Sequence, residues 1–198
     1  MKLHGLKVSG HVHRVELLLR MLGLPYEFIP APADVRAGSD FRTRLNLYGQ
    51  IPVLEDGELV LQDSNAILVY LCKRYAPGGS WLPEDPQGAA AVQRWLSVAA
   101  GEIAFGPANA RAHTLWGAPG HKPTASAVAE RLLGFMEAHL ATRGYLAAGH
   151  PTIADLACYS YIAVAPEGGV SLDSFPAVRA WLGRVEALAG FVAIPRSA

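Results

Sequence analysis

The stretch of the chain with the clearest chemical meaning is Gln50-Ile51-Pro52-Val53-Leu54. A proline at the first position of a strand removes an N–H that the sheet does not need, and an X-Pro bond reaches the cis form at a cost of only about 0.5 to 1 kcal/mol. Ile51-Pro52 is therefore a candidate cis bond. A cis turn would leave the N–H and C=O of Ile51 free to pair with a short extended ligand, as a strand edge does.

A candidate carboxylate site lies at Asp63-Ser64, eleven residues after Pro52. The apolar residues that follow continue into a predicted helix, which places Ser64 at or near the helix N-terminus. Unpaired N–H groups and the positive end of the helix dipole favour a carboxylate there, and Asp63 would face an amine. The alternative is that Asp63 or Ser64 merely caps the helix and that Pro52 merely starts a strand.

These two features, joined at this spacing, resemble the glutathione-binding half of the glutathione S-transferase family. That family carries a Val-Pro step and a Glu-Ser pair in a thioredoxin-like domain, where this chain has Ile51-Pro52 and Asp63-Ser64. The resemblance implies that Gln50, Ile51 and Pro52 position the backbone of glutathione. It also implies that Asp63 and Ser64 hold the γ-glutamyl end.

Ser9 is the residue expected to activate the thiol. It falls between the first predicted strand and the first predicted helix, so we expect its hydroxyl near a helix N-terminus and near the Ile51-Pro52 step. A hydroxyl donor and a helix N-terminus stabilise a thiolate, and so lower the pKa of a thiol below about 8.5. Serine-type branches of the family place a hydroxyl here. The alternative role of Ser9 is a helix N-cap, which is geometrically compatible with the first.

Two histidines follow Ser9 on the same predicted helix. His11 and His13 stand two residues apart, where side chains point to opposite sides, so a joint metal site is disfavoured. Many serine-type relatives carry an asparagine at the position of His11. The resemblance implies that His11 is a second, weaker donor to the thiolate, and no metal is expected.

The elements around these residues predict a thioredoxin-like α/β domain over residues 1–76. The predicted order is βαβ, a short helix, a β-hairpin and a final helix, with the first three elements over residues 2–6, 12–22 and 26–29. Gly23 is expected to end the first helix, and Asp56-Gly57 to form the hairpin turn. The run Leu-Gly-Leu-Pro-Tyr-Glu at positions 22–27 is similar to that of many bacterial members of the family.

A second, all-α domain is predicted over residues 87–198. The breaker-rich residues 77–86 form a linker, and beyond them the strand signals stop. Helices are expected over residues 87–110, 124–142, 152–165 and 175–189. Thr152-x-x-Asp155 predicts an N-terminal capping box with a role in folding.

Composition argues against several classes of protein. Seventeen basic and seventeen acidic side chains leave no basic excess for nucleic acid. No apolar run reaches the length of a membrane span, and the N-terminus lacks the apolar core of a signal peptide. Cys72 and Cys158 lie in separate apolar runs without Cys-x-x-Cys spacing, so we expect buried free thiols in a reducing, cytoplasmic protein.

The second substrate is expected to be a small hydrophobic electrophile. The resemblance places its pocket between the segment before Ser9 and the second domain, with these candidates: Leu6, Lys7, Val8, Phe105, Asn109, Arg111 and Trp116. Taken singly, the aromatic residues could equally pack in the core, and Arg111 could lie on a solvated face. The apolar fraction of 51% indicates surface buried between subunits or a large monomeric core, and the resemblance implies a homodimer.

These patterns predict a glutathione transferase, in which glutathione is the co-substrate and its thiol attacks the electrophile. Two alternatives remain open. A glutathione-dependent isomerase, dehalogenase or peroxidase would use the same thiolate. A non-catalytic binding or regulatory protein would keep the fold without the chemistry.

Overall fold

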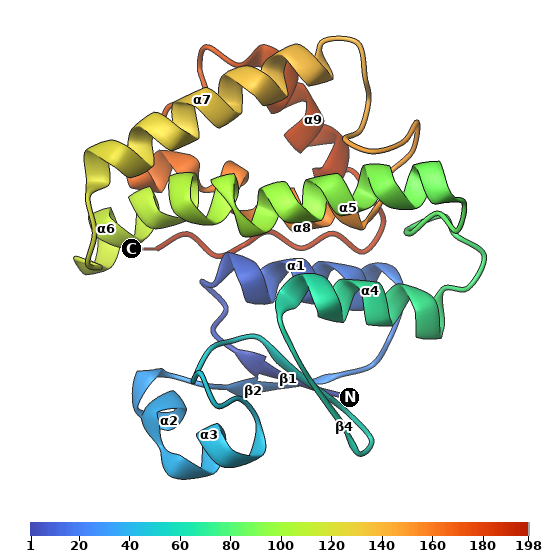
Figure 1. Cartoon of the computed structure of the whole chain (residues 1–198), viewed down its shortest axis with the longest axis vertical. Helices are drawn as coiled ribbons and strands as arrows, with labels where there is room; N and C mark the ends of the chain where they lie inside the picture. Colours follow the sequence, from blue (N-terminus) through green and yellow to red (C-terminus); the bar gives the residue numbers. More distant parts are fainter. Residues whose placement is uncertain (198) are drawn as a thin grey trace.

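The computed structural model describes residues 1–197, in two layers joined by one linker (Figure 1). The N-terminal layer is built on a four-stranded mixed sheet of order β2-β1-β3-β4. Its strands are β1 (Lys2–Gly5), β2 (Glu27–Pro30), β3 (Val53–Asp56) and β4 (Leu59–Gln62). Strands β1 and β2 run parallel, whereas β3 pairs antiparallel with both β1 and β4. The predicted βαβ unit and hairpin are confirmed.

Helices cover both faces of this sheet (Figure 1). They are α1 (Gly10–Met21), α2 (Ala33–Ala37), α3 (Ser39–Arg44) and α4 (Ser64–Tyr75). Successive side chains of β3 point to opposite faces. Leu54 therefore joins the main core with α1 and α4, while Val53 joins a small core with Phe41 of α3. The single short helix predicted before β3 is two helices, which meet at Gly38.

Helix α1 begins and ends at residues whose types favour those positions. Ser9 is its N-cap, and the Ser9 side chain accepts a hydrogen bond from the N–H of Val12 at 3.4 Å. Gly23 follows the helix with a φ of +64°, a conformation that glycine adopts readily, and the N–H of Leu24 donates to the C=O of Leu19. Gly23 ends the helix as predicted.

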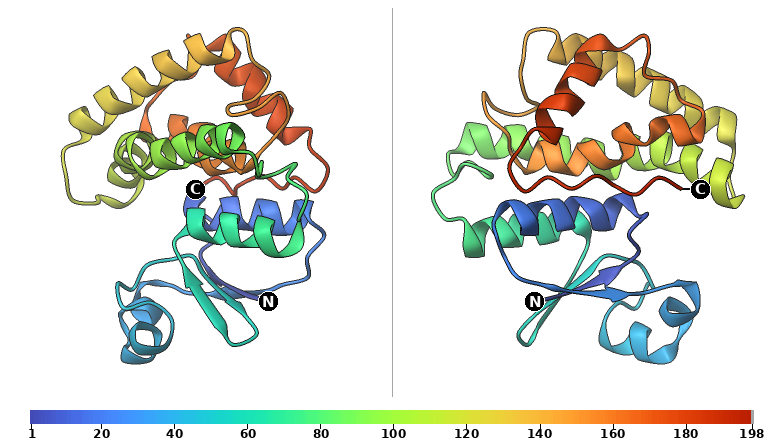
Figure 2. Two further views of the ribbon diagram at one scale, coloured as in Figure 1. Left: turned by 45° about the vertical axis from the view of Figure 1, so that its right-hand side comes forward. Right: turned by 180° about the vertical axis from the view of Figure 1, so that it is seen from behind.

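The second layer is all-helical. Its elements are α5 (Pro86–Ala100), the π-helical turn η1 (Ala104–Ala108), α6 (Asn109–Trp116), α7 (Lys122–Leu140), α8 (Ile153–Ala163), the 3₁₀ turn η2 (Ala165–Gly168) and α9 (Pro176–Glu186). Between β4 and residue 197 there is no further strand, as predicted. Both views of Figure 2 show the C-terminal segment running between the two layers. Over residues 1–197, no helix has the length and apolar character needed to cross a membrane.

The helix predicted over residues 87–110 is not continuous. Helix α5 stops before Gly101, the backbone then makes the turn η1, and α6 carries the chain on to Trp116. Pro107 lies inside η1 and accounts for this π-helical turn, because a proline inside a helix has no N–H to donate to the preceding turn. The other three predicted helices are present, with ends that differ by one to three residues.

A buried carboxylate ties three segments of the helical layer together. Thr152 and Asp155 form the predicted capping box at the start of α8. The carboxylate of Asp155 also accepts hydrogen bonds from the backbone N–H of Leu146 and from the indole N–H of Trp181, each at 2.9 Å. Burial raises the pKa of Asp155, and these donors oppose the rise. The carboxylate therefore supports the fold.

Replacing Asp155 by alanine is expected to lower the free energy of unfolding by about 3 kcal/mol or more, because several buried N–H donors lose their acceptor together. Urea denaturation followed by circular dichroism measures this loss. The matched control is Asp40→Ala, which removes an exposed carboxylate paired with Arg44 and should cost less than about 1 kcal/mol. Equal losses in the two variants would contradict the role given to Asp155.

Candidate active site

A cleft of about 640 Å³ lies on the N-terminal layer. It forms where the β1–α1 loop, the loop before β3 and the start of α4 meet. All the residues predicted to activate or bind glutathione line it: Ser9, His11, Gln50, Ile51, Pro52, Asp63 and Ser64. Four more lining residues were not predicted from the sequence: Arg36, Asn46, Tyr48 and Gln62. The fold thus brings residues from distant segments to one site.

The Ile51-Pro52 peptide bond is cis, as predicted. Pro52 is buried, whereas Ile51 is half-buried and lines the cleft. Neither the N–H nor the C=O of Ile51 has a hydrogen-bond partner in the part of the chain that the structure describes. The backbone at Ile51 can therefore pair with an extended ligand as the edge of a sheet does.

Two side chains hold the loop that leads to this edge. Asn46 is buried, donates to the C=O of Gln50 at 3.1 Å and accepts from the N–H of Tyr48 at 3.0 Å. Arg36 of α2 donates to the C=O of Gly49 at 3.3 Å. An asparagine that bonds to the backbone two residues on is a recognised turn signal, so Asn46 could have been found from the sequence. Arg36 carries no such local signal.

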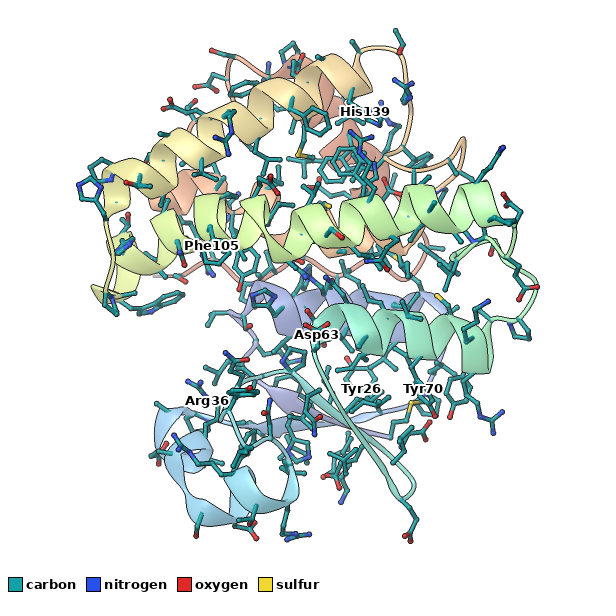
Figure 3. All side chains as sticks on the ribbon, in the orientation of Figure 1. Tyr26, Arg36, Asp63, Tyr70, Phe105 and His139 are labelled. Carbon is teal, nitrogen blue, oxygen red and sulfur yellow. The ribbon has the colours of Figure 1, made fainter. Side chains whose placement is uncertain are left out.

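The N-terminus of α4 forms another wall of the cleft. Asp63 is the N-cap, with a φ of +68°, and its Oδ1 accepts from the N–H groups of Asn65 and Ala66 at 2.9 Å. Asp63 therefore caps α4, which confirms the capping alternative for this residue. Its carboxylate occupies the N–H groups of Asn65 and Ala66, which were expected to be free for a ligand. Within residues 1–197, the N–H of Ser64 and the second carboxylate oxygen of Asp63 have no partner. Figure 3 shows Asp63 at the start of α4, on the side of the N-terminal layer that faces the helical layer.

Ser9 caps α1 and lines the cleft at the same time. Its Oγ accepts only the long bond of 3.4 Å from Val12, and the described residues leave its hydroxyl proton unused. The N-terminus of α1 adds a field that favours a negative charge nearby. The arrangement can therefore offer one O–H donor to a ligand thiolate.

His11 lies beside Ser64 and packs edge-on against Tyr161 of α8. The two ring centroids are 5.0 Å apart, and Nδ1 of His11 is 3.5 Å from Oγ of Ser64. Burial and the charge of Arg14 lower the pKa of His11 to about 3. The imidazole is therefore neutral at physiological pH, with one N–H to donate.

His13 points away from the cleft. Its Nε2 donates to the C=O of Val192 at 2.8 Å, and its Nδ1 then accepts from the hydroxyl of Ser160 at 2.9 Å. The two histidines do not converge on a common point, as predicted. Across residues 1–197, no group of three His, Cys, Asp or Glu side chains gathers closely enough to hold a metal ion.

The residues predicted to form the electrophile pocket do not line this cleft. Phe105 and Trp116 are 66% and 56% exposed, so neither packs in the core. Lys7 donates to the carboxylate of Glu16 and lies 4.0 Å from the ring centroid of Phe28. Its charge is thus already paired within the N-terminal layer.

The remaining candidates come from the β1–α1 loop and from the start of α6. Leu6 and Val8 are half-buried in the β1–α1 loop, and Asn109 is exposed at the start of α6. Figure 3 shows Phe105 on the helical layer above Asp63. An aromatic surface is therefore available on the helical side of the site.

Arg111 is buried, so the solvated-face alternative is wrong for this residue. Its Nε donates to Glu167 at 2.7 Å, its Nη1 to the C=O of Val8 at 2.8 Å and its Nη2 to Oγ of Ser197 at 2.9 Å. Val8 immediately precedes Ser9. Arg111 therefore fixes the position of the β1–α1 loop from the helical layer.

Both cysteines are free and buried, as predicted. Burial raises the pKa of Cys72 to about 12 and also raises the pKa of Cys158. Neither lines the cleft. A thiolate at this site must therefore come from a ligand.

The sequence of this chain matches a known protein family in both of its halves. Residues 3–81 match the glutathione S-transferase N-terminal domain, and residues 121–189 match the glutathione S-transferase C-terminal domain. Glutathione S-transferase 3 of Zea mays is 38% identical in an alignment 168 residues long, which covers 78% of this chain and 73% of that protein. A probable glutathione S-transferase of Oryza sativa subsp. japonica is 32% identical in an alignment 197 residues long, which covers 91% of this chain and 89% of that protein.

Solved structures agree over almost the whole chain. A glutathione S-transferase from Pseudomonas fluorescens Pf-5 superposes with a TM-score of 0.88 at 33% identity, covering 98% of each chain. One from Xanthobacter autotrophicus Py2 gives 0.88 at 32% identity, covering 98% of this chain and 96% of its own. The fold and the cleft define a two-domain protein with a thioredoxin-like half and an all-helical half. The chain belongs to the glutathione S-transferase family of enzymes, as its motifs predicted.

The neutral state of His11 predicts how the stability of the protein depends on pH. The unfolded chain binds a proton on His11 below about pH 6.5, whereas the folded protein does not until about pH 3. The free energy of unfolding therefore decreases as the pH falls from about 6.5 to about 3. The variant His11→Asn should lose less of this free energy on acidification than the wild type does. Urea denaturation between pH 7 and pH 4 measures the difference.

The matched control for this experiment is His150→Asn. His150 is exposed, so its removal should leave the acid-side loss of the wild type in place. If His11→Asn and the wild type lose stability equally on acidification, the imidazole of His11 is not held neutral in the fold.

Proposed function

We propose that this enzyme is a glutathione transferase that binds glutathione in the cleft and activates its thiol beside Ser9. One observation carries the proposal. A single cleft joins a hydroxyl that caps a helix, an unpaired strand-like edge at Ile51 and the N-terminus of α4. An extended tripeptide with a central thiol needs these features together.

The charges of the cleft also complement those of glutathione. The γ-glutamyl end of the tripeptide carries an ammonium and a carboxylate, and the glycyl end carries a second carboxylate. The unused oxygen of Asp63 suits the ammonium, and the N–H and hydroxyl of Ser64 suit the neighbouring carboxylate. Arg36 supplies a cation for the glycyl carboxylate. The cysteinyl backbone would then pair with Ile51, next to Gln50 and Pro52.

Ser9 acts in this proposal by stabilising an anion. Its O–H donates to the sulfur of glutathione and so favours loss of the thiol proton to water. The N-terminus of α1 and the neutral imidazole of His11 add to the same effect. The thiolate then attacks the electrophile and a carbon–sulfur bond forms, with the displaced group leaving or the added electrons taking up a proton. Such conjugation of electrophiles is a detoxification chemistry.

Removing the hydroxyl of Ser9 is expected to lower kcat/KM by on the order of 10²-fold, as loss of one preorganised donor does. Bound glutathione should show its ultraviolet thiolate absorbance at a pH well below the free thiol value of about 8.5 in the wild type, and not in Ser9→Ala. Ser9→Ala also removes an N-cap, at about 1 kcal/mol of stability, whereas Ser9→Gly costs only a few tenths.

Ser9→Gly is therefore the matched variant for the hydroxyl, and Ser97→Ala, an exposed serine of α5, is the control for the assay. Both Ser9 variants should lose the thiolate signal if the hydroxyl is responsible. A signal that survives in both would assign activation to His11 or to a backbone N–H. Absence of saturable glutathione binding in the wild type would favour a non-catalytic protein on the same fold.

The electrophile would bind on the helical side of the site. Exposed aromatic surface at Phe105 and Trp116 and the half-buried Leu6 and Val8 favour a small hydrophobic molecule. A panel of a chloronitrobenzene, a hydroperoxide, a haloalkane and a maleyl compound separates the general transferase from the peroxidase, dehalogenase and isomerase alternatives. Turnover of one class alone would decide against a general transferase.

We further propose that the enzyme is a cytoplasmic homodimer. Leu47 and Tyr48 are 77% and 83% exposed, on the loop that borders the cleft, and large exposed apolar side chains favour burial against a partner.

Light scattering after size exclusion should give twice the chain mass of 21.1 kDa. Tyr48→Ser should shift this mass towards the monomer, whereas a monomeric wild type would refute the assembly.

A further inference from the structure

An arginine lies completely buried beneath the start of α4. Arg14 of α1 is only 1% exposed. Its Nη1 donates to Oγ of Ser64 at 3.3 Å and to Oδ1 of Asn65 at 3.0 Å. Its Nε and Nη2 are buried without any hydrogen-bond partner in the described chain. Nor does any carboxylate of residues 1–197 form a salt bridge with it.

This charge is poorly compensated by the protein itself. A guanidinium stays protonated in proteins, and a buried cation without a carboxylate partner is costly. The positive end of the α4 dipole lies beside the guanidinium, at Ser64, and adds to its positive charge. The carboxylate of Asp63 favours the charged form of Arg14 from a distance, but it forms no salt bridge with it and accepts through Oδ1 from the N–H groups that begin α4. An anion bound over Ser64 would offset both positive charges.

Arg14 also determines how Ser64 can act. Because a guanidinium only donates, Oγ of Ser64 must be the acceptor in its contact with Arg14, and its own proton is left to point elsewhere. The contact of Oγ with His11 is 3.5 Å long, too long to hold that proton strongly. Asn65 is fixed in turn, because its Nδ2 donates to the C=O of Leu96 on α5 at 3.0 Å.

We infer that Arg14 is a positioning residue for the carboxylate of the γ-glutamyl group. It supplies buried positive charge under the binding position and keeps the hydroxyl of Ser64 oriented to donate to the ligand. This inference rests on the proposed function, since it takes glutathione as the ligand. It assigns recognition of that carboxylate to a residue that does not line the cleft.

The test compares two ligands that differ only in this carboxylate. Glutathione and its analogue with 4-aminobutyryl in place of γ-glutamyl are titrated calorimetrically against the wild type, Arg14→Met and Arg14→Lys. The wild type should prefer glutathione, and Arg14→Met should lose about tenfold or more of its glutathione affinity, equivalent to about 1.4 kcal/mol, with little change for the analogue. Arg14→Lys, which keeps the charge, should retain much of the preference. In turnover, the loss should appear in KM for glutathione more than in kcat.

Arg20→Met, an exposed arginine on the same helix, is the matched control and should keep the wild-type preference. If Arg14→Met does not fold, as judged by circular dichroism, Arg14→Gln replaces it as the neutral variant, because glutamine can still donate to Asn65. Equal preference in the neutral variant and the wild type overturns the inference and leaves the proposed function intact. A wild type that does not bind glutathione overturns both.

Discussion

Helix α1 is buried on every side, because the sheet packs against one face and the helical layer against the other. Residues 12–19 are all buried, and an all-round buried helix is ordinarily apolar. This one nevertheless carries His13, Arg14 and Glu16 in its middle. Glu16 is paired with Lys7, and His13 with groups of the helical layer and the C-terminal segment. Arg14 alone is left with unused donors, directly beneath the cleft.

The position of the candidate site follows from the contacts of α1 with the helical layer. Gly10 allows the helix N-terminus to approach Tyr161, since a Cβ at Gly10 would lie 2.8 Å from that ring. Arg111 holds the preceding loop through the C=O of Val8. Ser9 lies between these two contacts, so the placement of its hydroxyl depends on both layers even though the cleft is lined by one.

The start of α4 shows how one terminus can serve both folding and binding. Asp63 uses one carboxylate oxygen to cap the helix and leaves the other facing outward, while Arg14 places positive charge behind Ser64. The site therefore offers the negative charge of Asp63 at the surface and the positive charge of Arg14 beneath it. A γ-glutamyl group is itself such a pair, with an ammonium and a carboxylate on one carbon. Binding would therefore match two opposite charges at once.

The sequence by itself determined the features that depend on neighbours along the chain. The cis step at Ile51-Pro52, the helix end at Gly23 and the capping box at Thr152 are local, because each is set by backbone geometry or by bonds within a few residues. The order of elements and the family motifs then led to the fold and to the residues that line the cleft. The prediction failed over residues 87–110, where α5 ends at Gly101 and Pro107 lies in a π-helical turn.

Only the tertiary structure decided which long polar side chains act together. Arg111 meets the C=O of Val8 across 103 residues, and Arg14 meets Ser64 across 50. Arginine side chains can reach many positions, so residue type and spacing do not specify their partners. Burial selects the partner, because a desolvated charge must find acceptors wherever the packing places them.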